Sequence, residues 1–180
     1  KGIFTFDDSK SSFEKEFTLE QDQSRIELNS ELDQDKLLNI NYISPLEHLA
    51  TSKLISQAIK AGNKNKLIKI MKIFDKEIVS LDIIDENGRP IPYIEHQKLG
   101  MVPLSTFGDG LKKALIIAAN IVSVKEGVLL IDEIETSIHK KALLQFFQWF
   151  IKSSFQYNVQ SFIATHSLEA IDALINASEE

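Results

Sequence analysis

The chain has 180 residues, of which 43% are hydrophobic, 26% are charged and none is cysteine. This composition suits a globular domain with a substantial core, and it excludes disulfides and thiolate metal sites. No apolar run approaches the roughly 20 residues that a membrane span requires, so no membrane association is expected. The net charge of −6 argues against a broad nucleic-acid-binding face, although a local basic stripe or another segment could still contact DNA.

The first part of the chain predicts strands followed by a pair of helices. Residues 1–32 alternate apolar and polar side chains, which is typical of half-buried antiparallel strands. Apolar residues then recur at helical spacing over residues 45–75, and Ala61-Gly62-Asn63 interrupts the run. Strand-like segments at residues 78–84 and 91–94 flank Asn87-Gly88, a strong hairpin turn signal. Pro90 and Pro92 predict that the second strand lies at an edge or is irregular.

Helices and strands alternate in the last part of the chain. Helices are expected over residues 111–124 and 140–152 and from residue 168 to about 175. Between them, residues 127–132 and 159–164 form short apolar runs. Strands that are apolar on both faces and alternate with helices indicate a parallel sheet covered on each side.

Both predicted strands of this sheet end in polar residues. Asp132 and Glu133 follow the first strand, and Thr165-His166-Ser167 follows the second. Because ligands bind at the carboxyl ends of strands in open parallel sheets, these side chains are expected to converge. The run from Gly127 to Glu133 has the pattern of a Walker B motif, in which Asp handles Mg²⁺ and Glu polarises the attacking water. The alternative is a buried strand that ends in an exposed acidic turn.

Two further segments are candidates for phosphate contacts. His166 could donate to a γ-phosphate or sense its presence, whereas a structural histidine is the alternative. The segment Leu104-Ser105-Thr106-Phe107-Gly108-Asp109-Gly110 directly precedes a predicted helix. Its glycines and the free N–H groups of the helix start suit phosphate oxygens, whereas a plain capped loop is the alternative.

The order of these motifs resembles the ABC-like AAA ATPases associated with the OLD (overcoming lysogenization defect) nucleases and, more distantly, RecF and SMC heads. The resemblance is strong over residues 102–175, which contain PLSTFGDGLKKAL, GVLLIDEIETSIHKKAL and FIATHSLEAI, and thin before Tyr42. It implies an α/β P-loop NTPase fold of the ABC-ATPase type, with three parts. Residues 1–41 would be a β-rich remnant of the N-terminal lobe, residues 42–101 a helical arm and β-hairpin, and residues 102–180 the C-terminal lobe with the parallel sheet.

The resemblance also implies roles for single residues, with ATP and Mg²⁺ as cofactors. Asp132 would belong to the Mg²⁺ shell, Glu133 would be the catalytic carboxylate, and His166 would be the switch histidine. The segment from Glu135 to His139 is similar to the D-loop, with His139 itself structural. The signature loop, which clamps nucleotide held by the partner subunit, would comprise Ser105, Gly108, Asp109, Gly110 and Lys112.

The sequence departs from the family pattern in two respects. Its signature reads STFGDG rather than the Ser-Gly-Gly of transporters, which leaves open which residue contacts phosphate, and it contains no GxxxxGK[ST] phosphate-binding loop. We expect that loop upstream of Lys1 in a longer, cytoplasmic parent protein, and little ATP binding by this chain alone. The favoured interpretation is an ATP-hydrolysing head that forms a homodimer through composite ATP sites and switches an effector protein or appended domain. The alternatives are a non-hydrolysing scaffold and the motor part of an OLD-type nuclease.

Overall fold

The chain divides into two compact units, Lys1–Leu37 and Leu38–Glu180, in the computed structural model. The structure describes residues 2–7, 12–18, 27–28, 38–45 and 51–179. In the first unit, β1 (Gly2–Asp7), β2 (Ser12–Thr18) and β3 (Glu27–Leu28) form an antiparallel sheet in that order. The predicted antiparallel strands are therefore confirmed, except that the alternation expected around Leu19 and Ile26 lies outside the described residues.

A parallel sheet of three strands lies at one end of the second unit. Its order is β4 (Ile40–Ile43), β8 (Val128–Ile131) and β9 (Gln160–Ile163). The parallel pairing of β8 with β9 confirms the prediction, whereas β4 was not predicted. Gly127 lets β4 approach the start of β8, since a Cβ on Gly127 would lie 2.2 Å from the Asn39 carbonyl oxygen.

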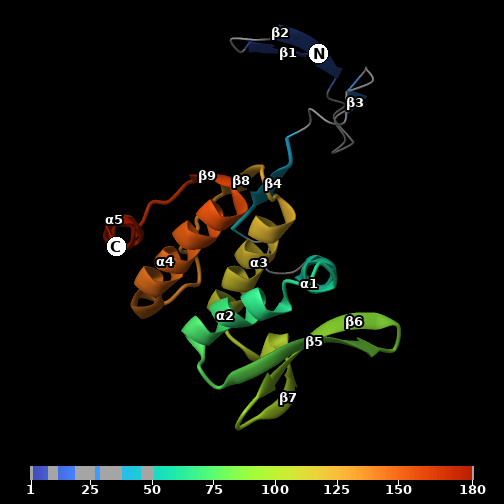
Figure 1. The fold of residues 1–180 in the computed structure, drawn as a ribbon, viewed down its shortest axis with the longest axis vertical. Coiled ribbons are helices and arrows are strands. Elements are labelled where there is room, and N and C mark those ends of the chain that lie inside the picture. The colour runs from blue at the N-terminus through green and yellow to red at the C-terminus, as the bar shows by residue number, and fades with distance from the viewer. Residues whose placement is uncertain (1, 8–11, 19–26, 29–37, 46–50, 180) are drawn as a thin grey trace. The chain divides into compact units, whose positions relative to one another are not determined.

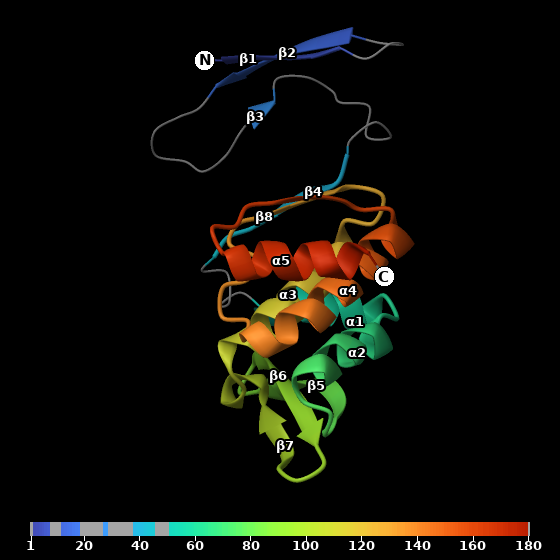
Figure 2. The same cartoon turned by 90° about the vertical axis from the view of Figure 1, so that its left-hand side faces the viewer.

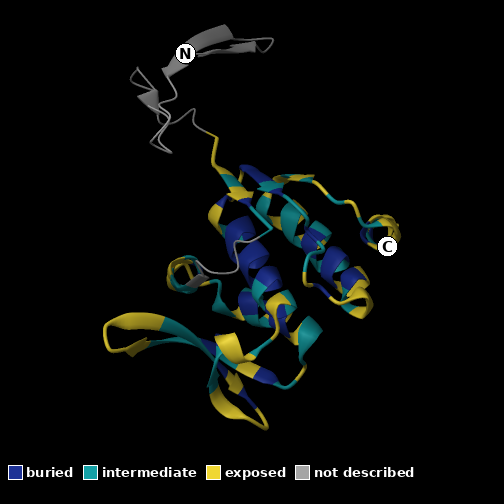
Figure 3. Cartoon of the chain, turned by 180° about the vertical axis from the view of Figure 1, so that it is seen from behind, coloured by how far each residue is buried: buried dark blue, intermediate teal, exposed yellow. Residues whose placement is uncertain are grey.

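Three helices follow the prediction, namely α3 (Asp109–Ser123), α4 (Lys140–Tyr157) and α5 (Leu168–Ser178). Helices α3 and α4 cover one face of this sheet, and α5 packs against α4 (Figures 1 and 2). The buried residues in Figure 3 run mainly along α3 and α4, where Leu115, Phe146 and Phe147 are almost completely enclosed. Helix α4 is longer than predicted and ends where Asn158 adopts a left-handed conformation with φ of 53°.

The opposite face of the parallel sheet is not covered by helices of the described residues, contrary to the prediction. Tyr42, Leu130 and Phe162 are register partners on that face, and Tyr42 and Phe162 are 54% and 55% exposed. The sheet was expected to be covered on each side, yet within the described residues helices cover only the face that holds Ile43, Leu129 and Ile131. We expected coverage of both faces because both carry apolar side chains. An apolar face indicates that something packs against it, but it does not identify the segment that does so.

The predicted helix pair is confirmed as α1 (Thr51–Lys60) and α2 (Lys64–Phe74). Gly62 between them has a φ of +78°, a conformation that glycine adopts without strain. Both helices pack against α3, and Figures 1 and 2 place them on the side of α3 that faces away from the parallel sheet. They therefore connect the parallel sheet and its helices to a second sheet.

That second sheet is antiparallel and has the order β5 (Ile78–Glu86), β6 (Arg89–His96) and β7 (Gly100–Pro103). The hairpin turn is confirmed, with positive φ at Asn87 and Gly88. The expectation that the second strand lies at an edge or is irregular holds for only part of it, because β6 is the middle strand of the sheet. Strand β7 pairs only with Tyr93–His96, so Pro90 and Pro92 lie in the half of β6 that has a single neighbour.

No helix among residues 38–45 and 51–179 is long and apolar enough to cross a membrane. The structural boundary falls between Leu37 and Leu38, and β4 joins the sheet of the second unit. The sequence analysis divided the chain into three functional parts, with boundaries after residues 41 and 101. That division stays a prediction.

Candidate functional site: the carboxyl ends of the parallel strands

Strand β8 delivers two carboxylates to the edge of the parallel sheet. Its middle is buried, and the strand ends at Ile131, directly before Asp132 and Glu133. The Asp132 N–H donates to the Ile43 carbonyl at 3.0 Å, and the Ala164 N–H donates to the Ile131 carbonyl at 2.9 Å. The ends of β4, β8 and β9 are thus aligned side by side. Asp132 and Glu133 are both half-buried, so they are accessible to a ligand at this edge.

The expected convergence of Glu133 and His166 is observed. His166 Nδ1 lies 3.8 Å from Glu133 Oε1, and the imidazole is 80% exposed. His166 is held by the turn that follows β9, where the Ser167 N–H donates to Thr165 Oγ1 at 3.1 Å. Ser167 then caps α5 by accepting from the Ala170 N–H. The histidine therefore projects from a short, hydrogen-bonded connection between strand and helix.

Thr136 orients the Glu133 carboxylate, a role that sequence reasoning missed. Its Oγ1 donates to Glu133 Oε2 at 3.0 Å, and its N–H donates to the Glu133 carbonyl at 3.0 Å. Glu133 has a φ of 47°, which non-glycine residues rarely adopt and which is found preferentially at functional sites. One carboxylate oxygen is thus tied to Thr136, while the other is directed toward His166. The spacing of Glu and Thr three residues apart was the available signal.

The loop before α3 presents the start of a helix with no side-chain cap. A 3₁₀ turn at Leu104–Thr106 leads to Gly108, which is the N-cap and has open space around its α-carbon. Ser105 is exposed, and Lys112 Nζ contacts Asp109 Oδ1 at 3.0 Å. Among the residues that the structure describes, no hydrogen bond or ion pair joins Ser105 or Lys112 to Glu133 or His166. Ser105 and Lys112 therefore do not bond directly to Glu133 or His166 within this part of the chain.

A close contact within this chain explains why residue 110 is glycine. A Cβ on Gly110 would lie 2.4 Å from the Ser137 carbonyl oxygen, in the loop that follows Glu133. Ser137 itself has a φ of 69°. At the end of this loop His139 caps α4, since its Nδ1 accepts from the Lys141 N–H at 3.2 Å. That contact agrees with the structural role expected for His139.

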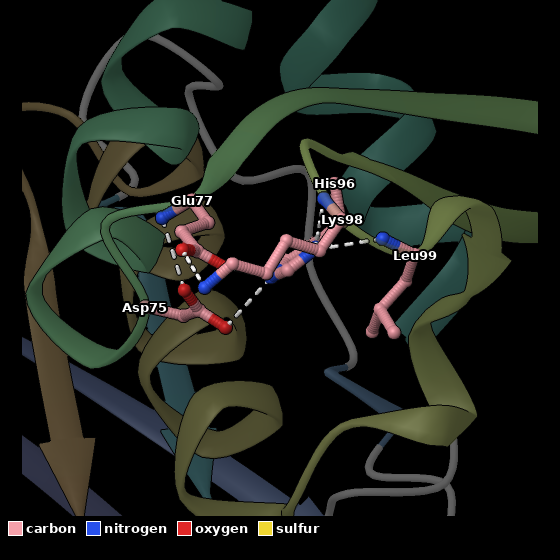
Figure 4. Close-up of polar contacts among 5 residues, drawn as sticks. All are labelled: Asp75, Glu77, His96, Lys98 and Leu99. Carbon is pink, nitrogen blue, oxygen red and sulfur yellow. Dashed lines mark hydrogen bonds and ion pairs between the residues drawn. The ribbon is translucent and has the colours of Figure 1, made fainter.

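A second polar cluster, which was not predicted, lies where α2 meets the antiparallel sheet (Figure 4). Asp75, Glu77 and His96 offer ligand atoms within 4.8 Å of one another. The buried His96 has Nε2 at 3.1 Å from Asp75 Oδ2, while its Nδ1 accepts from the backbone N–H groups of Lys98 and Leu99 at 3.2 Å. Nδ1 is therefore the unprotonated nitrogen, and Nε2 carries the proton.

This tautomer disfavours a metal ion in the cluster. A metal bound to Nε2 would require the ring proton to move to Nδ1, where it would face two N–H donors. In addition, Lys98 Nζ forms an ion pair with Glu77 Oε1. The cluster is best described as a hydrogen-bonded connection between the end of α2 and β6, and we do not count it as a catalytic or metal centre.

The fold and the site define an α/β domain of ATPase type, with an aspartate, a glutamate and a histidine at the carboxyl ends of neighbouring parallel strands. The chain belongs to the family described as AAA domain, putative AbiEii toxin, Type IV TA system, whose model matches residues 2–172. The resemblance to ABC-like AAA-family ATPases is thereby confirmed.

Two curated relatives match parts of the chain. An uncharacterised protein of Methanocaldococcus jannaschii is 47% identical over 74 residues, which is 41% of this chain and 65% of the relative. An ATP/GTP phosphatase of Helicobacter pylori is 32% identical over 114 residues, which is 62% of this chain and 30% of the relative. The chain thus spans less than two thirds of the length of each.

Solved structures with similar folds include SMC ATPases. One, from work on ATP-driven dimerization and DNA-stimulated activation of SMC ATPases, has a TM-score of 0.49 and 14% identity, and the match covers 68% of this chain and 77% of that chain. The SMC head domain from Thermotoga maritima has a TM-score of 0.47 and 14% identity, and covers 95% of this chain and 65% of that chain.

Proposed function

We propose that this chain is the C-terminal part of an ATP-hydrolysing head of the ABC type, and that Asp132, Glu133 and His166 form its hydrolytic edge. The observation that carries the proposal is the approach of His166 to Glu133, 3.8 Å apart at the ends of neighbouring strands. Membership of an AAA-domain family and similarity to a protein named ATP/GTP phosphatase support nucleoside triphosphate hydrolysis.

Glu133 is the group that would accept a proton from the attacking water. Thr136 holds one carboxylate oxygen, which leaves the oxygen near His166 free to orient a water molecule. His166 is largely exposed, so its imidazole can reach a phosphate oxygen and donate a hydrogen bond. The pair would thus orient the nucleophile on one side and contact the phosphate on the other.

Asp132 suits a magnesium ion because a carboxylate provides the hard oxygen ligand that Mg²⁺ prefers. It is half-buried at the same strand edge as Glu133. Bound Mg²⁺ would neutralise charge that develops on the phosphate oxygens. In this arrangement Asp132 holds the ion and Glu133 remains available for water.

The loop before α3 would act on nucleotide held by a second copy of the head. Ser105, Gly108, Asp109 and Lys112 border the uncapped start of α3, whose N–H groups favour anions. Among the described residues no hydrogen bond or ion pair joins Ser105 or Lys112 to Glu133, which fits a site completed by a partner. Gly110 would support the loop through its contact with Ser137. ATP binding and homodimer formation would then be thermodynamically linked.

Another segment of the parent protein would supply the phosphate-binding loop, because the sequence contains no GxxxxGK[ST]. We place this parent in the cytoplasm and infer that opening of the dimer switches an effector protein or an appended domain, such as a nuclease. The intact Asp132, Glu133 and His166 favour turnover over a scaffold role.

The decisive experiment compares wild type, Glu133→Gln and Glu95→Gln in the full-length protein. Glu95 is an exposed residue of β6, so its replacement is a matched carboxylate-to-amide control. We expect Glu133→Gln to lower kcat by about 10²–10⁴, the usual contribution of a general base, and Glu95→Gln to leave it unchanged. Size-exclusion chromatography with ATP and Mg²⁺ should show a dimer that accumulates only in Glu133→Gln. Equal turnover in all three proteins would refute the assignment.

A further inference from the structure

A cavity of about 260 Å³ lies between α2, α3 and α4, away from the strand ends described above. Its apolar lining residues include Leu67 and Ile121, which are almost completely buried. Its lining includes three cationic and two aromatic side chains, and no Asp or Glu contributes to it. These five side chains are Lys66, Lys69, Trp149, Lys152 and Tyr157.

The lysines of this cavity are not neutralised by carboxylates. Lys66 Nζ donates to the Tyr157 hydroxyl and lies 4.4 Å from the centre of the same ring. The Tyr157 hydroxyl donates in turn to Asn63 Oδ1 at 3.0 Å, which positions the ring. Lys69 and Lys152 are exposed, and among the described residues no carboxylate pairs with any of the three lysines.

Positive charge is concentrated on the arm that forms one wall of the cavity. Residues 51–74, which include α1 and α2, contain six lysines and no Asp or Glu, although the whole chain has a net charge of −6. A local basic surface on an acidic protein is the pattern expected where an anion binds. The aromatic rings add a flat, apolar surface beside the charges.

We infer that this cavity binds a nucleotide unit, with its phosphate on Lys69 and Lys152 and its base against Trp149. Ammonium groups supply phosphate contacts that do not depend on sequence, and a base stacked on an aromatic ring adds affinity for any base. The unit could belong to a single strand of nucleic acid or to a free nucleotide. The basic surface continues along α2 to the exposed Lys72, which favours a strand. This inference does not depend on the proposed ATPase.

The test measures binding of a fluorescein-labelled oligothymidylate to the full-length protein by anisotropy, without ATP and with EDTA. The test variant is Lys69→Glu/Lys152→Glu. Lys141→Glu is the matched control, because Lys141 is an exposed lysine at the opposite end of α4 from Lys152. We expect the double variant to bind at least about tenfold more weakly, with a salt slope reduced by about 0.7 per lost phosphate contact. The control should bind as wild type does.

Fluorescence of Trp149 reports on the cavity itself. It is the one tryptophan among these 180 residues, so the signal that Trp149→Phe removes belongs to this position. We expect oligothymidylate to quench that signal in wild type and in Lys141→Glu, but much less in the double variant. If thymidine monophosphate quenches as strongly per nucleotide, the natural ligand is a free nucleotide; if only the oligonucleotide quenches, it is a strand. No quenching by either ligand, or wild-type affinity of the double variant, would overturn the inference.

Discussion

The α-carbon of Gly110 lies so close to the loop after β8 that a Cβ on it would be 2.4 Å from the Ser137 carbonyl oxygen. Backbone atoms cannot rotate away as a side chain can, so the loop or the start of α3 would have to move. This contact couples the position of α3 to the loop that carries Thr136. It gives a physical reason for glycine at this position that is independent of any ligand.

We therefore expect Gly110→Ala to destabilise the protein by about 1–3 kcal/mol, the usual cost of overpacking. Gly108→Ser is the matched control, because nothing lies within 4 Å of a Cβ there and serine is a good N-cap. Thermal unfolding of both variants measures the difference. Equal melting temperatures for Gly110→Ala and wild type would show that the loop adapts without cost.

Thr136 is expected to act as a positioning residue for Glu133. Thr136→Val removes the hydroxyl that donates to Glu133 Oε2 and keeps the side-chain volume. We expect kcat of the full-length protein to fall about tenfold, which corresponds to the roughly 1.4 kcal/mol of one hydrogen bond to a charged group, with little change in KM. Thr136→Ser restores the donor and should restore turnover. Loss of activity in both variants would point to a packing role instead.

His96 is expected to stabilise the fold without binding a metal. His96→Ala removes a buried imidazole and leaves two backbone N–H groups and Asp75 without their partner. We expect a loss of about 2–4 kcal/mol in the free energy of unfolding, measured with urea. After treatment with EDTA, added Zn²⁺ should not raise the melting temperature of the wild type. A rise that disappears in His96→Ala would establish the metal site that the tautomer argues against.

The ion pair between Lys64 and Asp82 should make a small, pH-dependent contribution that links α2 to β5. Lys64 Nζ lies 2.5 Å from Asp82 Oδ1, and this hydrogen bond lowers the pKa of the Asp82 carboxyl. Because the pKa is lowered in the folded state, the stabilisation is present above the unfolded pKa of about 3.9 and is lost as the pH falls through the folded value.

The two side chains are partly exposed, so solvent screening keeps the coupling small. We expect a double-mutant cycle of Lys64→Met and Asp82→Asn to give about 0.2–1 kcal/mol at pH 7 and less below about pH 4. A coupling energy that stays constant over this pH range would show that Lys64 is not the cause of the lowered pKa of Asp82.

Local patterns predicted most of the helices and strands, and they failed where pairing partners are distant. Asn87-Gly88 specified its hairpin because the required positive φ is a local property. Pro90 and Pro92 indicated an edge that exists only in their own half of β6, because β7 pairs with the other half of that strand. Strand β4 was missed since its four residues carry little periodicity and its partner β8 is remote in sequence.

For the candidate site, the sequence alone placed Asp132, Glu133 and His166 at the ends of two strands. Because parallel strands expose their carboxyl ends at one edge of a sheet, it also predicted that these side chains lie close together. Only the tertiary structure showed that Thr136 holds Glu133, that Gly110 contacts Ser137, and that Lys69 and Lys152 from different helices border one cavity with Trp149. The physical reason is that strand ends follow from local hydrophobic patterns, whereas contacts between elements depend on how their surfaces pack, which no local pattern records.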